Sequence, residues 1–148
     1  MKLSLKTLFA ATALPFVVTA CANSQDAPTP ITTQDLQHHN WELLAVDGQT
    51  ISLEEGESAP RLEIGEKMTA NGHAGCNNFF GQGELKDNQF RIEKMGMTMK
   101  MCGDDAMQVE QAFSQTLSDW SEMTLTNQGL ELKGAAHTLT FKLNDWKN

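Results

Sequence analysis

The sequence predicts a mainly β domain with one helix, in which a curled antiparallel sheet forms an incomplete β-barrel flanked by that helix. Two observations favour this α+β class. Apolar and polar residues alternate in about eight short runs separated by turn residues, which is typical of strands with one buried face. One later run instead repeats its apolar residues every three or four positions, as an amphipathic helix does. The 148 residues suffice for one such domain.

The strands follow a short helical turn that is expected over residues 33–37. Alternating Trp41, Leu43 and Ala45 predict a first strand, and Asp47-Gly48 after it favours a two-residue hairpin. Further strands, with turns at 87–88 and 127–129, are expected around these alternating apolar residues: Leu62 and Ile64; Met68 and Ala70; Leu85; Phe90 and Ile92; Met123 and Leu125; Leu130 and Leu132; and Leu139, Phe141 and Leu143.

We expect Asp104 or Asp105 to cap the helix, since carboxylates suit the positive amino end of a helix. Its apolar stripe would cover the open face or edge that a curled sheet leaves. The stripe consists of Ala106, Val109, Phe113, Leu117 and Trp120.

The first twenty residues are typical of an export signal. Lys2 and Lys6 precede an apolar stretch over 8–18, which contains Pro15 and is too short for a permanent membrane span. Residues 18–21, Val-Thr-Ala-Cys, resemble the lipobox of bacterial lipoproteins. The alternative is an ordinary secretory leader with a cysteine that happens to lie at the cleavage point.

The lipobox resemblance implies that Cys21 is lipidated and that the leader is cut just before it. Residues 1–20 are then a lipoprotein signal peptide, and 21–32, polar with two prolines, a flexible tether. Residues 33–148 form the folded domain. Ala22, rather than an aspartate, follows the cysteine, which by resemblance to sorted lipoproteins favours the outer membrane, on its periplasmic face.

The charge balance excludes two classes of protein. The chain has 11 lysines and arginines against 19 aspartates and glutamates, a net charge of −8. So acidic a surface would repel the phosphates of nucleic acids and the head groups of anionic lipids. We therefore expect no nucleic-acid partner and no basic membrane-binding patch.

If Cys21 carries lipid, two of the three cysteines remain and can pair with each other. Cys76 and Cys102 could then form one disulfide in an oxidising compartment. Two buried free thiols or a shared metal site are the alternatives. Neither cysteine lies in a Cys-x-x-Cys spacing, so a catalytic thiol is not expected.

The segment 95–101 carries four methionines at alternate positions and has three possible uses. The methionines could fill the core, line a pliable groove for acyl chains or peptides, or bind copper(I), which prefers soft sulfur ligands. Core packing is favoured, and the groove is preferred to copper. The glycine- and asparagine-rich segment 72–83 is interpreted as a structural loop pinned by Cys76, rather than a ligand loop.

Catalytic and metal-binding motifs are not found in the sequence. The four histidines lack a ligand spacing, and His38-His39 is interpreted as a solvated pair. No serine lies in a Gly-x-Ser-x-Gly elbow. We expect no enzyme, cofactor or metal.

Five segments together resemble the META domain, and the resemblance covers residues 33–148. It implies a mostly antiparallel, barrel-like fold with one helix, an envelope location, and an association with heat response and novobiocin tolerance but with no established reaction. The fold is also similar to that of pilot lipoproteins, which suggests a pilotin-like chaperone. The segments are LQHHNWELLAVDG at 36–48, GCNNFFGQG at 75–83, MTMKMC at 97–102, the acidic-capped helix and LTFKL at 139–143.

The sequence therefore predicts a monomeric outer-membrane lipoprotein with a non-catalytic binding role in envelope stress. A pilotin-like chaperone for an outer-membrane protein and a periplasmic copper protein are the alternatives. An apolar ligand or an envelope protein would occupy a groove lined by Phe79, Phe80, Met97, Met99, Val109, Phe113, Leu117 and Trp120.

Overall fold

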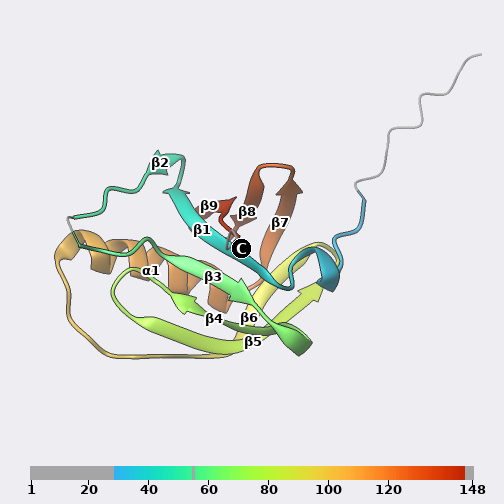
Figure 1. Ribbon diagram of the computed structural model, residues 1–148, viewed down its shortest axis with the longest axis horizontal. Helices are drawn as coiled ribbons and strands as arrows, with labels where there is room; N and C mark the ends of the chain where they lie inside the picture. The colour runs from blue at the N-terminus through green and yellow to red at the C-terminus, as the bar shows by residue number, and fades with distance from the viewer. Residues whose placement is uncertain (1–28, 55, 146–148) are drawn as a thin grey trace, which may run out of the picture.

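The computed structural model describes residues 29–54 and 56–145, in which one antiparallel sheet curls around a core and a single helix (Figure 1). The expected signal peptide, Cys21 and residues 22–28 of the expected tether lie outside the described residues. In chain order the elements are η1 (Thr33–Asp35), β1 (His39–Val46), β2 (Gln49–Thr50), β3 (Arg61–Ile64), η2 (Glu66–Met68), β4 (Thr69–His73), β5 (Asn78–Lys86), β6 (Gln89–Met97), α1 (Asp104–Ser118), β7 (Ser121–Thr126), β8 (Gly129–Lys133) and β9 (Thr138–Leu143).

The first long strand pairs with the last, and this pairing closes the sheet into a barrel. β1 pairs with β3 along one edge, where Trp41 lies opposite Leu62, and with β9 along the other, where Leu43 lies opposite Phe141. β2 only extends the hairpin of β1, so the other eight strands form the ring. The expectation of an incomplete barrel is therefore wrong, because β9 supplies the partner for the free edge of β1. The mainly β class with one helix is confirmed.

Two hairpins turn where the sequence predicts them. Asp47 and Gly48 have φ values of 51° and 76°, and Asp87 and Asn88 have 51° and 58°. Two successive residues with positive φ give a turn whose twist matches that of the paired strands. The turn residues thus set the register of β1 with β2 and of β5 with β6.

The helix fills the place where the barrel wall is weakest. β6 and β7 pair only at Gln89–Glu122 and Phe90–Ser121, and α1 is the connection between these two strands. The helix ends at Ser118, so Trp120 lies beyond it and does not continue its apolar stripe. Gly103 is the N-cap, and the two expected capping acids lie in the first turn instead, where they still suit the helix dipole.

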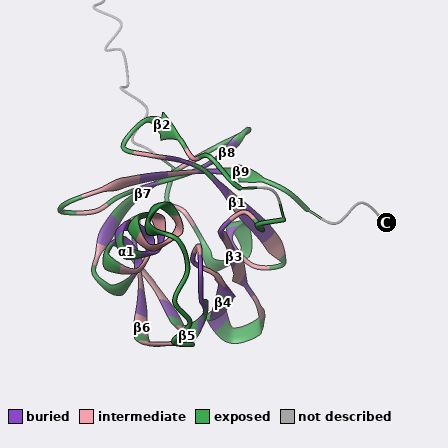
Figure 2. Ribbon diagram, turned by 90° about the vertical axis from the view of Figure 1, so that its left-hand side faces the viewer, coloured by how far each residue is buried: buried purple, intermediate pink, exposed green. Residues whose placement is uncertain are grey.

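Buried residues of the strands and of α1 form the core of the barrel. Figure 2 marks the buried positions along the ribbon in purple. Phe113 of α1 is fully buried between Phe79 of β5 and Phe141 of β9, with ring centroids 5.3 and 5.9 Å away. Leu117, one turn further along α1, is also fully buried. The helix therefore belongs to the core and does not merely flank it.

Candidate functional site

The structure does not bring the residues of the expected apolar groove together on one surface. Phe79, Phe113 and Leu117 lie in the core, whereas Phe80 is 65% exposed and Met99 is 96% exposed. Phe79 and Phe80 are neighbours on β5 and so point to opposite faces of the sheet. The remaining members, which are partly buried, are Met97, Val109 and Trp120.

The methionine run divides in the middle and does not form one face. Met95 and Met97 lie on β6 and pack against the core, while Met99 and Met101 follow the strand and are 96% and 87% exposed. Cys102 is bonded to another cysteine and offers no thiolate. The thioethers therefore do not converge on a copper(I) site, and core packing holds for only half of the run.

A disulfide joins Cys76 to Cys102, with their Cα atoms 5.8 Å apart. Of the three uses left open for this pair, the structure selects the crosslink over free thiols or a shared metal site. The bond fastens the loop between β4 and β5 to the segment that leads into α1.

Next to the disulfide, two buried polar side chains tie three parts of the chain together. The Glu110 carboxylate on α1 accepts hydrogen bonds from the backbone N–H groups of Cys76 and Asn77 and from Asn77 Nδ2 at 2.9 Å. Asn77 Oδ1 accepts from the N–H of Lys100 at 2.6 Å, and Asn77 Nδ2 donates to the Lys100 carbonyl at 3.1 Å. The helix, the loop and the 98–102 segment therefore form one fixed unit.

The loop approaches the helix so closely that only glycine fits at position 75. Gly75 has a φ of 137°, and a Cβ added there would lie 2.8 Å from the carbonyl oxygen of Ala106. Only residues 74–77 of the expected loop 72–83 lie between strands, because 72–73 belong to β4 and 78–83 to β5; this shorter loop has the structural role that the sequence predicts. Sequence inspection missed Glu110 because 33 residues separate it from Asn77, and no local pattern links them.

The surface is hollowed where the β1–β2 hairpin faces α1. This groove, which we call the hairpin groove, has a volume of about 470 Å³. Ile51 and Val109 give it apolar walls, and the amide side chains of Gln49, Gln108 and Gln111 surround them. Its other lining residues are Val46, Asp47, Thr50, Ala112 and His137. The sequence-predicted Val109 is the only member of the expected apolar set that lines this groove.

Two histidine–aspartate pairs link the ends of β1 to the residues that flank β9, a junction we call the β1–β9 seam. One of these pairs borders the hairpin groove. Asp47 at the end of β1 accepts a hydrogen bond from His137 Nδ1 at 2.8 Å and another from the N–H of Thr138 at 2.8 Å. These two hydrogen bonds, that of His137 first, lower the pKa of Asp47 below its usual value.

The other end of the seam repeats this arrangement. Asp145 accepts a hydrogen bond from His39 Nδ1 at 2.8 Å and another from the N–H of Asn40 at 3.1 Å. His38 lies 3.3 Å from Glu66 and its side chain is 66% exposed, in agreement with the solvated pair that the sequence predicts, whereas the His39 side chain is 33% exposed and is held by Asp145. Sequence inspection missed both histidine–aspartate pairs because about a hundred residues separate the two partners of each pair.

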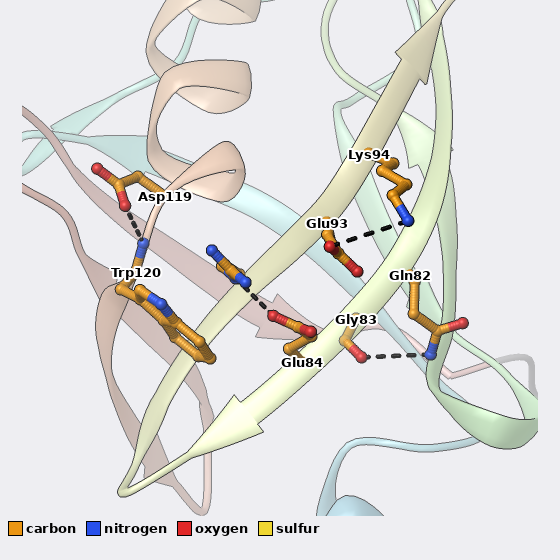
Figure 3. A network of polar contacts seen from close by, with 8 residues as sticks. Gln82, Gly83, Glu84, Glu93, Lys94, Asp119 and Trp120 are labelled. Atoms are coloured by element: carbon orange, nitrogen blue, oxygen red, sulfur yellow. Dashed lines mark hydrogen bonds and ion pairs between the residues drawn. The ribbon is translucent and has the colours of Figure 1, made fainter.

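A third polar contact covers the weak β6–β7 junction. The Arg91 guanidinium pairs with Glu84 and lies 4.6 Å from the ring centroid of Trp120 (Figure 3). Trp120 thus covers the outside of β6 rather than an internal ligand site.

The described residues form neither a metal-binding cluster nor a membrane-spanning helix. Within 29–54 and 56–145, three or more histidine, cysteine or acidic side chains do not gather where they could hold a metal. Nor does this part of the chain contain a helix with the length and hydrophobicity needed to cross a membrane.

Comparisons with known proteins agree with this fold. Residues 34–146 match the model of the META domain. The heat shock protein HslJ of Escherichia coli (strain K12) is 32% identical over 146 residues, which cover 97% of this chain and all of HslJ.

Two solved NMR structures have the same architecture. One is 32% identical, covers 80% of this chain and 99% of its own, and superposes with a TM-score of 0.70. The other, from Burkholderia xenovorans, is 24% identical, covers 95% and 99% of the two chains, and has a TM-score of 0.61. The second likeness concerns the fold alone.

Proposed function

Because this chain belongs to the META domain family and is similar to a heat shock protein over nearly its whole length, we propose that it is a stress-related lipoprotein of the outer membrane that acts by binding, without catalysis. It would work as a monomer on the periplasmic face, under heat or in the presence of novobiocin. The stress-related role follows from the family and its relative, whereas the anchor and the binding mode are developed below.

The proposed anchor is a lipid on Cys21. Residues 18–21 supply the lipobox-like signal, and the N–H of Ile31 donates a hydrogen bond to Asn88 Oδ1 at 2.8 Å, so the chain joins the barrel at this point. In the proposed tether Ile31 lies ten positions after Cys21, and a flexible chain of that length spans about 17 Å. The barrel would therefore stay close to the membrane surface, within reach of envelope proteins.

The packed interior is the observation that supports binding on the outside. Phe113 and Leu117 occupy the space that a ligand inside the barrel would need. The hairpin groove combines apolar walls with three amide side chains. Amides can pair with the N–H and C=O groups of a peptide while Ile51 and Val109 contact its apolar side chains.

The groove chemistry thus favours a polypeptide over a purely apolar ligand. It also gives the second candidate function some support, since a pilotin-like chaperone must hold an extended segment of its client. A copper-binding function gains no such support, because the methionines are divided between the core and the solvent.

Complementation of a deletion strain tests the proposed function. Wild-type protein should restore growth under heat and novobiocin, whereas Cys21→Ser should lose labelling by a fatty-acid precursor and should not restore growth. A Cys21→Ser protein that is still labelled would refute the anchor. Full rescue by unlabelled Cys21→Ser would refute the need for it.

A photo-crosslinking side chain placed at Gln108 tests the groove. We expect a discrete crosslinked envelope protein from position 108 and none from the matched control position Glu122, which is exposed and lies outside the groove lining. Equal products from both positions would show that the groove is not the contact surface.

A further inference from the structure

Arg61 and His73 lie directly opposite each other on β3 and β4. Their neighbours Leu62 and Gly72 are buried, so Arg61 and His73 point to the outer face of the barrel. Like charges in directly opposed positions on neighbouring strands destabilise a sheet, so a protonated His73 would be unfavourable beside Arg61.

A third positive group is held at the same place by the disulfide-linked segment. Both backbone groups of Lys100 bond the Asn77 side chain, at 2.6 and 3.1 Å, and Asn77 belongs to the loop that follows His73. The positive charge of Lys100 acts on His73, as does that of Arg61. Three separate parts of the chain therefore bring two cations, Arg61 and Lys100, and the titratable ring of His73 together in a protein whose net charge is −8.

Two carboxylates near this cluster are engaged by other groups, and a third, Glu63, lies two residues from Arg61 on the same face of β3. Glu42 lies opposite Arg61 on β1, but it bonds Lys142 at 2.8 Å and the Asn144 amide. Glu110 accepts its three hydrogen bonds from Cys76 and Asn77. Among the described residues, Arg61 has no ion-pair partner within 4 Å.

Two nitrogen atoms of the cluster are buried and lack partners among the described residues, Arg61 Nε and His73 Nδ1. Buried polar nitrogens without a partner are costly in a folded protein. Burial lowers the pKa of His73, and the charges of Lys100 and Arg61 lower it further, opposed by the Cys76 backbone and Glu110. An anion beside the cluster would offset the positive charges of Arg61 and Lys100, and rotation of the Arg61 and His73 side chains would bring their buried nitrogens to it.

We propose that Arg61, His73 and Lys100 form a binding site for a phosphate group. An arginine guanidinium fits phosphate oxygens through paired N–H donors, and a lysine adds a point charge. The site is separate from the hairpin groove and from the proposed lipid anchor, so it stands or falls independently of them.

The phosphate could come from inorganic phosphate or from a lipid head group, which offer the same oxygens. Apolar side chains border the site: Phe80 lies diagonal to His73 on the outer face and is 65% exposed, and Met99 and Met101 flank Lys100. These side chains could contact acyl chains, so the two sources are separated by experiment.

Proton titration of the His73 ring by NMR, in the full-length mature protein, tests the proposal. Addition of inorganic phosphate should raise the pKa of His73, because a bound anion stabilises the protonated ring. Arg61→Gln should weaken this binding about tenfold, since a charge-assisted hydrogen bond is lost. Lys86→Gln, an equal change of charge on the exposed end of β5, should leave it unchanged.

The same titration with lipid vesicles tests whether the phosphate belongs to a lipid head group. A response to phosphatidylglycerol vesicles but not to phosphate, lost in Arg61→Gln, would support the site and identify the source as lipid. If neither probe moves the His73 titration, or if Arg61→Gln and Lys86→Gln respond as the wild type does, the proposal is overturned. The spectra of all variants report directly whether the barrel remains folded.

Discussion

Removal of the Cys76–Cys102 disulfide should destabilise the barrel strongly. The bond spans a sequence separation of 26 residues, and closing a loop of this length lowers the entropy of the unfolded chain by an amount worth about 3.5 kcal/mol at 25 °C. With a urea dependence of about 1.5 kcal/mol/M, the unfolding midpoint should fall by about 2 M. Urea unfolding of the Cys76→Ala/Cys102→Ala double variant measures this shift.

Removal of the disulfide should also reduce local stability more in some segments than in others. Lys100 is held by Asn77 next to the disulfide, so amide hydrogen exchange in the 98–103 segment should rise more than in β8. Reduced wild-type protein provides the matched comparison, because it lacks the bond but keeps both side chains. An unchanged midpoint in both forms would refute the reasoning, since the crosslink would then not restrict the unfolded chain.

Three other predictions concern the core and the seam. Phe113→Ala should lower the free energy of unfolding by about 3–5 kcal/mol, measured by urea titration, because the ring fills the barrel centre; a loss below about 1 kcal/mol would contradict this packing. Gly129→Ala should lower the melting temperature, since its Cβ would lie 1.9 Å from the Phe141 carbonyl oxygen; an unchanged melting temperature would mean that β8 and β9 are further apart. Asp47 has a lowered pKa, so its ionised form stabilises the barrel above its unfolded pKa of about 3.8, and this contribution disappears as the pH falls through the folded pKa. Asp47→Asn should therefore be less stable than wild type near pH 7 but not at pH 2, and an equal deficit at both values in thermal unfolding would refute the link to ionisation.

The strands and the helix could be predicted because their signals are local. Apolar residues alternate around Trp41 and Phe141, and they recur every three or four positions from Val109 to Phe113. These periods indicate which side of each strand or helix is buried. Closure of the barrel could not be predicted in this way. It depends on the pairing of β1 with β9, and alternation shows which face of a strand is buried but not which strand lies beside it.

The prediction of an apolar groove was wrong for a similar reason. A period of two places Met95 to Met101 on one face only while the strand continues, and β6 ends at Met97. Lys94 also has a positive φ of 52°, and the register with β5 shifts between Phe80 and Gln82. Such an irregularity redirects the side chains that follow it.

The disulfide could be predicted from the number of cysteines, whereas the contacts around it could not. Glu110 resembles any solvated acid on a helix, and Arg61 resembles any charged residue at the start of a strand. Their roles arise only when β3, β4, the 98–102 segment and α1 meet at one end of the barrel.

The intact mass of the protein purified from membranes shows whether a lipid holds the barrel there. We predict a chain that begins at Cys21 and carries the added mass of acyl groups, with Cys76 and Cys102 two hydrogens lighter than free thiols. A chain that begins at Met1, or at Cys21 with no added mass, would contradict a barrel held at the membrane by lipid.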